Sequence, residues 1–330
     1  MEQGRVVILD ALRAVAALSV CLYHFICTTT EYITDPTVLS VFSNGKYGVQ
    51  MFFVISGFVI PMSMYKGSYS FKKMGTFLAK RLTRLEPPYM FSILLVLMLL
   101  ASRSFLGMSN EHIQLSVKQI AAHFMYLIPF FDDLKWLNQV YWTLAVEFQY
   151  YLFMALIYLM LVSKRQVVRI LAYLVFASGF FFENDDFLPH WLPVFLIGVV
   201  LFQRKFELIG WLEFIIVSCI IFLGLCYQQP MAIVAFVLFT FLSILFLTNK
   251  NVPILSYFGK SSYSIYLIHP IIGAAVINVL SHRFVLWYQK VGVISTGVAV
   301  TLLFSYLMYR FIERPSMNWS ASFKYKDAGQ

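Results

Sequence analysis

The sequence has little charge for its length, since only 12% of its 330 residues are Asp, Glu, Lys or Arg. A typical soluble domain carries about twice that fraction, and 60% of the residues here are hydrophobic. The scarcity of charge excludes an ordinary soluble globular protein and indicates a polytopic membrane protein. The 33 Phe and 20 Tyr residues agree with this, because aromatic side chains suit lipid-facing and interfacial surfaces.

Cysteine is scarce as well, and linkers are lacking. The four cysteines are Cys21, Cys27, Cys219 and Cys226. No CxxC pair or Cys/His ligand spacing occurs among them, so the sequence predicts neither a metal site nor a disulfide. No Gly/Ser-rich or Pro-rich linker and no internal repeat divides the chain. We therefore expect one membrane domain over residues 1–315 and a short, polar, disordered cytoplasmic tail over residues 316–330.

The apolar stretches predict an all-α fold with about ten transmembrane helices, because most of them approach the ~20 residues that cross a bilayer. The ten predicted spans are residues 6–26, 47–64, 88–102, 142–162, 167–182, 190–203, 211–227, 231–247, 263–280 and 291–311. The stretch 119–131 has only 13 residues, so we expect an interfacial or re-entrant segment there. It lies in the largest outer loop, residues 103–141, the expected place for a lid or an acceptor-binding element.

The basic residues are distributed unevenly between the two sets of loops. Eighteen of the 25 Lys and Arg residues lie on one side of the predicted spans, six lie on the other side, and Arg13 lies within the first span. The more basic side of a membrane protein is the cytoplasmic one, so both termini are expected to be cytoplasmic. The formal net charge of +9 then follows from topology, and binding to nucleic acid is not expected.

The first predicted span carries three ionisable residues, Asp10, Arg13 and His24. Such groups cost at least a few kcal/mol each in hydrocarbon, so they mark a candidate functional site. Arg13 and His24 are eleven residues apart, about three helical turns, which places them on one face with a separation of roughly 16 Å. Asp10 lies one turn before Arg13 and can pair with it. Alternatively, Asp10 and Arg13 anchor the helix at one interface and His24 reaches the other.

Two further stretches carry candidate binding residues. Ser56 and Gly57 lie in the middle of the second span, where small residues either permit close helix packing or line a ligand passage beside the first helix. The segment 72–84 is strongly basic, and Arg81 and Arg84 fall on one helical face. These basic residues either set the orientation of the protein in the membrane or bind phosphate groups.

Glu147 is the candidate in the fourth span. It lies about one turn into the membrane, and a carboxylate at that depth needs a partner. Thr143 and Tyr151, each four residues away, are the local candidates for this partner. His24 is the candidate on another helix, where a carboxylate would orient the imidazole and raise its basicity.

Three residues near the ends of spans complete the set. Trp142 has the type and position of an interfacial anchor. His269 lies in the ninth span before a proline that kinks the helix, and it has either a structural or a functional role. Glu313 is expected to form a local ion pair where the last span ends.

These stretches together resemble the acyltransferase-3 family of integral membrane O-acyltransferases, and the resemblance covers nearly the whole chain. The stretches that correspond to family motifs, in the family's order, are residues 9–13 with His24, 52–58, 80–89, 141–151, and 264–270 followed by 313–315. The departures are Ala11 and Ala14, where glycine is usual, Glu86, where an apolar residue is usual, and Phe148, where a second acidic residue is common. The soluble domain that is fused to some larger members is not expected here.

The resemblance implies an acyl-CoA donor, most often acetyl-CoA, that is a co-substrate and not a tightly bound cofactor. The residues expected to hold this donor are Asp10, Arg13, Arg81 and Arg84. Its arm would follow the first helix toward His24, which would act as a general base or as a transient acyl carrier. Glu147 would orient the imidazole. The expected passage or substrate residues are Ser56, Gly57, Trp142, Tyr151 and His269.

The acceptor that the resemblance implies is a hydroxyl group of a carbohydrate, such as an exopolysaccharide, a lipopolysaccharide or another cell-surface glycan. The protein would then be a multi-pass protein in the lipid bilayer of a bacterial cytoplasmic membrane. A transporter that exports a small polar solute is the alternative, although the inverted halves and broken helices typical of transporters are not seen. The sequence predicts no oligomeric state.

Overall fold

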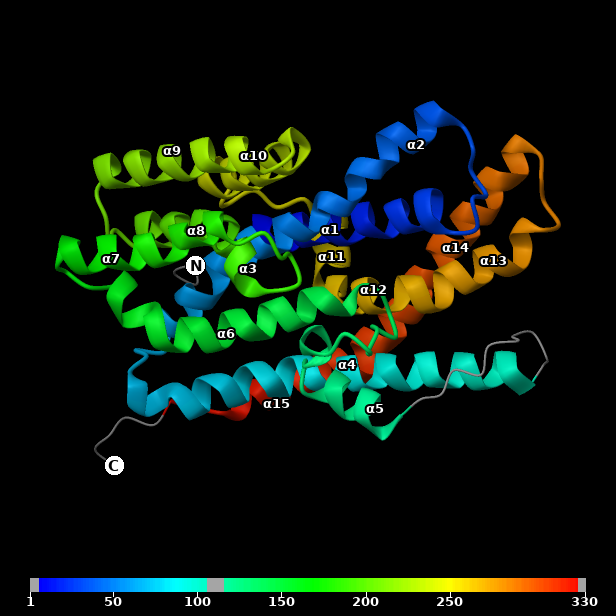
Figure 1. Cartoon of the computed structure of the whole chain (residues 1–330), viewed down its shortest axis with the longest axis horizontal. Coiled ribbons are helices and arrows are strands. Elements are labelled where there is room, and N and C mark those ends of the chain that lie inside the picture. Colours follow the sequence, from blue (N-terminus) through cyan, green and yellow to red (C-terminus); the bar gives the residue numbers. More distant parts are fainter. Residues whose placement is uncertain (1–5, 106–115, 326–330) are drawn as a thin grey trace.

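The computed structural model describes residues 6–105 and 116–325, and this part of the chain is helical without any β-strand (Figure 1). Short 3₁₀- and π-helices carry the symbol η. In chain order the elements are α1 (Ile8–Tyr23), η1 (His24–Thr28), α2 (Pro36–Ser43), η2 (Asn44–Tyr47), α3 (Gly48–Lys66), η3 (Phe71–Lys73), α4 (Met74–Phe105), α5 (Val117–Phe124), η4 (Ile128–Phe130), α6 (Tyr141–Leu161), α7 (Gln166–Ala177), η5 (Ser178–Phe181), α8 (Leu188–Lys205), α9 (Trp211–Gln228), α10 (Met231–Phe246), α11 (Pro253–Lys260), α12 (Ser262–Ile268), η6 (His269–Gly273), α13 (Ala274–Ser281), α14 (Trp287–Met308), η7 (Tyr309–Glu313) and α15 (Arg314–Ser322).

Within the described residues, seven helical stretches are long and apolar enough to cross a membrane. They are Ile8–Thr28, Pro36–Lys66, Phe71–Ser102, Tyr141–Leu161, Trp211–Gln228, Ser262–Ser281 and Trp287–Ser322. Two more apolar helices, Gln166–Phe181 and Met231–Phe246, are shorter. Each of the ten predicted spans coincides with helical structure. The number of crossings and the cytoplasmic location of the termini stay predictions.

Helix α3 lies in the middle of the bundle and packs against α1, α6, α8 and α10. Figure 1 shows that α1, α4, α6 and α9 lie along roughly the same axis and that α14 crosses it obliquely. It also shows α4 and α15 side by side, although they are far apart in the sequence. Aromatic rings join three of the central helices. The ring of Phe195 on α8 stacks on that of Phe53 on α3 at 4.8 Å and on that of Tyr150 on α6 at 4.0 Å between centroids.

The contact between α3 and α8 depends on two glycines. A Cβ atom on Gly57 would lie 2.1 Å from the backbone oxygen of Phe195, and one on Gly198 would lie 2.1 Å from the backbone oxygen of Val54. Only glycine permits helix backbones to approach this closely. Gly57 therefore serves helix packing, and of the two small residues predicted to line a passage only Ser56 faces the cavity described below.

We expect Gly57→Ala to lower the free energy of unfolding by about 1–3 kcal/mol, the usual cost of overpacking. The matched control is Gly292→Ala in α14, because a Cβ atom there meets nothing within 4 Å and alanine favours the helix more than glycine does. Thermal unfolding of both variants in detergent measures the difference. Equal melting temperatures for Gly57→Ala and Gly292→Ala would contradict the packing role.

The predicted outer-loop segment forms helix α5 and the turn η4, which are both too short to cross a bilayer. The buried His123 fixes this segment in place, since Nε2 accepts from the backbone N–H of Leu137 at 3.0 Å and Nδ1 donates to the carbonyl of Gln119 at 2.8 Å. Burial also lowers the pKa of His123, so the ring stays neutral and structural. Residues 106–115 of the same loop lie outside the described residues.

The expected disorder after residue 315 is wrong for the part of the tail that the structure describes. Helix α15 packs against α4, where the hydroxyl of Ser320 donates to the carbonyl of Lys80 at 2.6 Å. The ammonium group of Lys80 in turn donates to the carbonyl of Phe323 at 2.7 Å. A polar composition suggested disorder, but the partners of the tail lie about 240 residues earlier in the chain, where local patterns do not reveal them. Residues 326–330 lie outside the described residues.

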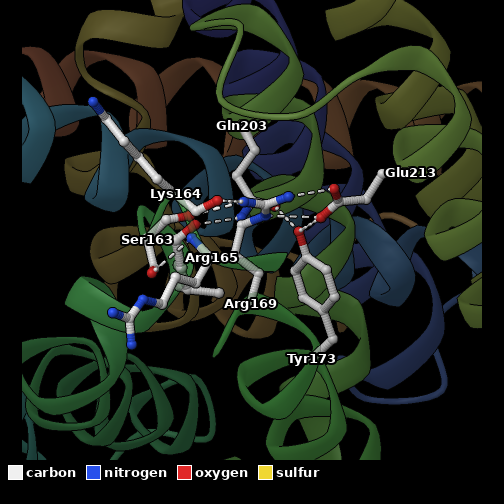
Figure 2. A network of polar contacts seen from close by, with 8 residues as sticks. Ser163, Lys164, Arg165, Arg169, Tyr173, Gln203 and Glu213 are labelled. Carbon is white, nitrogen blue, oxygen red and sulfur yellow. Dashed lines mark hydrogen bonds and ion pairs between the residues drawn. The ribbon is translucent and has the colours of Figure 1, made fainter. Parts of the chain in front are cut away.

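A largely buried ion pair joins α7 to α9 (Figure 2). Arg169 donates through Nε and Nη2 to the two carboxylate oxygens of Glu213, at 2.9 and 2.5 Å. Its Nη1 donates to the carbonyl of Ser163, just beyond the end of α6, at 2.8 Å. The hydroxyl of Tyr173 lies 3.1 Å from Glu213 Oε1 and 2.9 Å from Gln203 Oε1 on α8. Because each guanidinium nitrogen has a partner, this network fixes four helices at one end of the bundle.

Candidate active site

A cavity of about 630 Å³ lies between α1, α3, α4, α6, the segment from α11 to α12 and the segment from η7 to α15. Its charged lining residues are Asp10, Arg13, Lys66, Arg81, Arg84, Glu147, Lys260 and Glu313. Five of these residues are basic and three are acidic, so positive charge is in excess. The residues predicted from the sequence that line this cavity are Asp10, Arg13, Ser56, Arg81, Arg84, Glu147 and Tyr151.

The cavity follows α3 for nearly the whole length of the helix. Val49 in the first turn and Lys66 at the last position both line it. At ~1.5 Å per residue these two positions are about 26 Å apart along the helix axis. This distance is close to the ~30 Å thickness of the hydrocarbon core. The cavity is therefore long enough for an extended molecule that reaches across most of a bilayer.

The first turns of α1 place an ion pair in this cavity. Arg13 Nη1 donates to Asp10 Oδ1 at 3.4 Å, the pairing expected from their spacing. Helix α11 passes so close to Asp10 that a Cβ atom on Gly259 would lie 1.8 Å from the Asp10 backbone oxygen. Glycine at position 259 therefore lets α11 hold this end of α1, and with it Arg13, in position.

Glu147 organises the side of the cavity formed by α6. Its Oε1 accepts hydrogen bonds from the hydroxyl of Ser56 at 3.2 Å and from the hydroxyl of Tyr151 at 2.5 Å. The guanidinium of Arg81 lies 5.8 Å from the centre of the Tyr151 ring, within the range of a cation–π contact. Arg81 is buried, and its Nε has no hydrogen-bond partner among the described residues. Glu147 thus orients Tyr151, which supports an arginine that retains an unused donor.

The predicted contact between Glu147 and His24 is wrong. The side chain of His24 contacts Thr28 and His269, and it does not line the cavity. Glu147 lies instead near the part of α1 that carries Arg13, because the charges of Glu147 and Arg13 interact. Since Arg13 and His24 are about 16 Å apart along α1, a carboxylate near the first of them cannot bond to the second.

Glu313, which the sequence suggested only as part of a helix stop, is a residue of the cavity. Its carboxylate is buried and lines the cavity, where it accepts from the backbone N–H of Ser264 at 3.2 Å and from the Ser264 hydroxyl at 2.6 Å. The expected local ion pair at the helix stop is thus replaced by contacts with α12. The signal in the sequence was a carboxylate at the end of an apolar stretch, but its partner lies 49 residues away.

The imidazole rings of His24 and His269 lie beside each other, with 5.2 Å between their centroids. Each histidine begins a π-helix, His24 in η1 and His269 in η6. Such segments are rare and occur often at functional sites. Tyr266 connects this pair with the cavity, because it lines the cavity and its ring lies 6.0 Å from that of His269.

Trp142 lies outside the lining of the cavity. Its ring packs against those of Phe53 and Trp191, at centroid distances of 6.3 and 6.0 Å, so its role here is to join α3, α6 and α8. The described residues contain no group of three or more His, Cys, Asp and Glu side chains that could hold a metal ion. The side chains that could take part in binding or catalysis are those that line the charged cavity and those of the two histidines.

Comparison with known families adds the decisive observation. The family model described as an acyltransferase domain (Acyl_transf_3) matches residues 6–310. The chain belongs to the acyltransferase-3 family. No solved structure matches it.

The chain is similar in sequence to two proteins of Staphylococcus aureus with O-acetyltransferase names. SAR0937 of strain MRSA252, which bears an O-acetyltransferase name, is 26% identical over 379 residues, covering 96% of this chain and 59% of the relative. The O-acetyltransferase OatA of strain NCTC 8325 is 25% identical over 359 residues, covering 93% of this chain and 56% of the relative. The chain thus spans somewhat less than three fifths of the length of these relatives.

The structure shows the surroundings of the four residues that depart from the acyltransferase-3 pattern. Ala11 and Ala14 are buried, at 2% and 0% exposure, where their methyl groups are accommodated in the packing around α1. Glu86 accepts a hydrogen bond from the hydroxyl of Tyr126 at 2.8 Å, and Phe148 stacks on the Tyr126 ring at 5.1 Å. The two unusual residues on α4 and α6 therefore share one partner from the segment after α5.

Proposed function

We propose that the protein is a membrane O-acyltransferase that moves an acyl group, most readily acetyl, from cytoplasmic acyl-CoA to a hydroxyl group of a carbohydrate. The observation that carries this proposal is the positively charged cavity that follows α3 for about 26 Å and is lined by Tyr266, whose ring lies beside that of His269. The O-acetyltransferase names of the relatives support the same class of reaction.

The charge of the cavity suits the donor. An acyl-CoA has a phosphate-rich head and a long arm that ends in a thioester. Arginine binds phosphate with paired, charge-assisted hydrogen bonds, and Arg13, Arg81 and Arg84 line one cavity with Lys66 and Lys260. The head would bind these basic groups, and the arm would lie along α3 with its thioester toward Tyr266.

His24 is the proposed base. As the acceptor oxygen attacks the thioester carbon, the hydroxyl proton moves to the imidazole. The carbon–sulfur bond then breaks, and the CoA thiolate takes the proton from the imidazolium. In the alternative route the imidazole first accepts the acyl group itself and then passes it to the hydroxyl. Because His24 does not line the cavity, both routes require the thioester to pass Tyr266.

Transfer of label from radiolabelled acetyl-CoA tests the proposal. Membranes with and without the protein are supplied with the labelled donor and with an extract of bacterial surface glycans. Label is expected in a glycan fraction only when the protein is present. If acetyl-CoA is not consumed and a small polar solute crosses the membrane of proteoliposomes that contain the protein, the proposal is overturned in favour of an exporter.

We expect Arg81→Gln to raise the KM for acetyl-CoA about 10- to 100-fold. A hydrogen bond to a charged group contributes about 1.5–3 kcal/mol, and each ~1.4 kcal/mol is a factor of ten. The matched control is Lys72→Gln, which removes an exposed charge from the same basic segment outside the cavity. Equal effects of the two substitutions would instead assign this segment to membrane orientation alone.

A further inference from the structure

Thr28 lies one helical turn after His24 and contacts it twice. Its hydroxyl donates to the His24 carbonyl at 3.0 Å, and its Oγ1 lies 3.3 Å from His24 Nδ1. A hydroxyl group has one hydrogen and two lone pairs. When the Thr28 hydroxyl donates to the carbonyl, Oγ1 has only lone pairs left for Nδ1 and accepts from it. In this arrangement the hydrogen of the neutral His24 ring lies on Nδ1, and the lone pair lies on Nε2.

His269 has the same tautomer for an independent reason. Its Nδ1 lies 3.1 Å from the carbonyl oxygen of Ile265, which can only accept, so Nδ1 carries the hydrogen. The remaining ring nitrogen, Nε2, is buried and has no hydrogen-bond partner within the described part of the chain. An unsatisfied buried acceptor is costly, so this atom calls for a ligand that can donate a hydrogen bond.

We propose that Thr28 is a positioning residue that holds His24 as the Nδ1–H tautomer, so that Nε2 takes the proton of the acceptor hydroxyl. This inference rests on the acyl transfer proposed above. Neutral histidine in water favours the opposite tautomer, with the hydrogen on Nε2. Without the Thr28 hydroxyl, His24 would present a hydrogen at the position where the reaction requires a lone pair.

The paired histidines also define the chemistry of the acceptor. Two neighbouring rings that each carry a lone pair on Nε2 favour a partner with two hydrogens to donate. A pair of adjacent hydroxyl groups on a sugar has this property. His24 takes the proton of the reacting hydroxyl, and His269 accepts a hydrogen bond from its neighbour. A carboxylate, which has no hydrogen to donate, would leave both nitrogens unpaired.

Nitrogen NMR tests the tautomers without any donor or acceptor. The protein is prepared with ¹⁵N-labelled histidine in lipid nanodiscs, at a pH where the rings are neutral. Protonated and lone-pair ring nitrogens have well-separated chemical shifts, and His24→Asn and His269→Asn variants assign the signals among the six histidines. We expect Nδ1–H at both residues in the wild type and in Thr28→Ser, and a change toward Nε2–H at His24 in Thr28→Val. Nε2–H at His24 in the wild type would overturn the proposal.

Kinetics of label transfer from acetyl-CoA to the glycan acceptor separate positioning from folding. Thr28→Val is expected to lower kcat about tenfold with the KM for acetyl-CoA unchanged, and Thr28→Ser is expected to restore it. The control is Thr29→Val, because the Thr29 hydroxyl donates to the same His24 carbonyl at 2.8 Å without contacting the ring. Equal losses in Thr28→Val and Thr29→Val would overturn the inference. If the wild type shows the expected tautomers but His24→Ala keeps full activity, the proposed role of His24 in acyl transfer is refuted and the tautomer assignment stands.

The second hydroxyl contact has its own test. His269→Phe keeps an aromatic ring but removes the lone pair, so it is expected to raise the KM for the glycan acceptor about tenfold without changing the KM for acetyl-CoA. His269→Gln, which retains an acceptor oxygen, is expected to preserve most of the affinity. An unchanged acceptor KM in His269→Phe would exclude the contact with a neighbouring hydroxyl.

Discussion

Replacing His24 with alanine is expected to lower the rate of acyl transfer about 10²- to 10⁴-fold, the contribution typical of a positioned acid–base group. The His24 ring lies 5.2 Å from that of His269, and it contacts Thr28 at the end of α1. Initial rates of label transfer at saturating acetyl-CoA measure the effect. Binding of acetyl-CoA should persist, since Arg13 lies about 16 Å away along the helix.

His282→Ala is the matched control for this experiment. His282 is exposed after the end of α13 and lies outside both the cavity and the histidine pair. We expect this variant to transfer acyl groups at the wild-type rate. A His24→Ala protein that keeps the wild-type rate would remove His24 from the chemistry and would direct attention to the hydroxyl groups that line the cavity.

Replacing Arg169 with alanine is expected to destabilise the protein by about 3–5 kcal/mol, the cost of removing one partner of a buried ion pair. The loss leaves the Glu213 carboxylate buried without its two strongest donors and frees the carbonyl of Ser163. The side chains of Arg169 and Glu213 are 9% and 13% exposed, so water can replace little of this interaction. Thermal unfolding in detergent measures the loss.

Two comparisons show that the effect belongs to the ion pair. Arg165→Ala removes an exposed arginine one turn earlier and should leave the melting temperature nearly unchanged. The double variant Arg169→Ala and Glu213→Ala removes both charges, and we expect it to be more stable than Arg169→Ala alone. A double variant less stable than the single one would mean that Glu213 has partners that matter more than Arg169.

Contacts within one helix were predictable from the sequence. The spacing of Asp10 and Arg13 correctly predicts their ion pair. Glu147 likewise accepts a hydrogen bond from Tyr151, the local candidate four residues later. Hydropathy likewise locates the helices, since every predicted span coincides with helical structure. These predictions succeed because the period of 3.6 residues per turn fixes which side chains on one helix are neighbours.

Contacts between helices were not predictable in the same way. Glu147 and His24 lie on different helices, and the sequence does not specify how far each helix is shifted along its axis or rotated about it. The same limit hid the contact between Glu313, which lines the cavity, and Ser264. Gly57 was compatible with packing or with a passage, and only the position of α8 decided between them.

The π-helices at both histidines are a further feature beyond the reach of sequence patterns. A π-helix adds one residue to a single turn and leaves the apolar stretch around it unchanged in composition. Hydropathy therefore predicts an uninterrupted helix over η1 and over η6. The insertion nevertheless changes the direction of the side chains that follow each histidine.

The position of Tyr266 affects whether ions could leak through the cavity across a membrane. Its hydroxyl lies 2.9 Å from that of Thr143, and its ring lies 5.7 Å from that of Phe52, so the cavity is bordered by aromatic side chains where it approaches His269. An open aqueous path of this length would conduct ions, and each charge that crosses a potential of ~100 mV dissipates about 2.3 kcal/mol. If the acyl arm takes the path proposed above, this aromatic border would admit the acyl group without opening an aqueous path, and the membrane potential would be preserved.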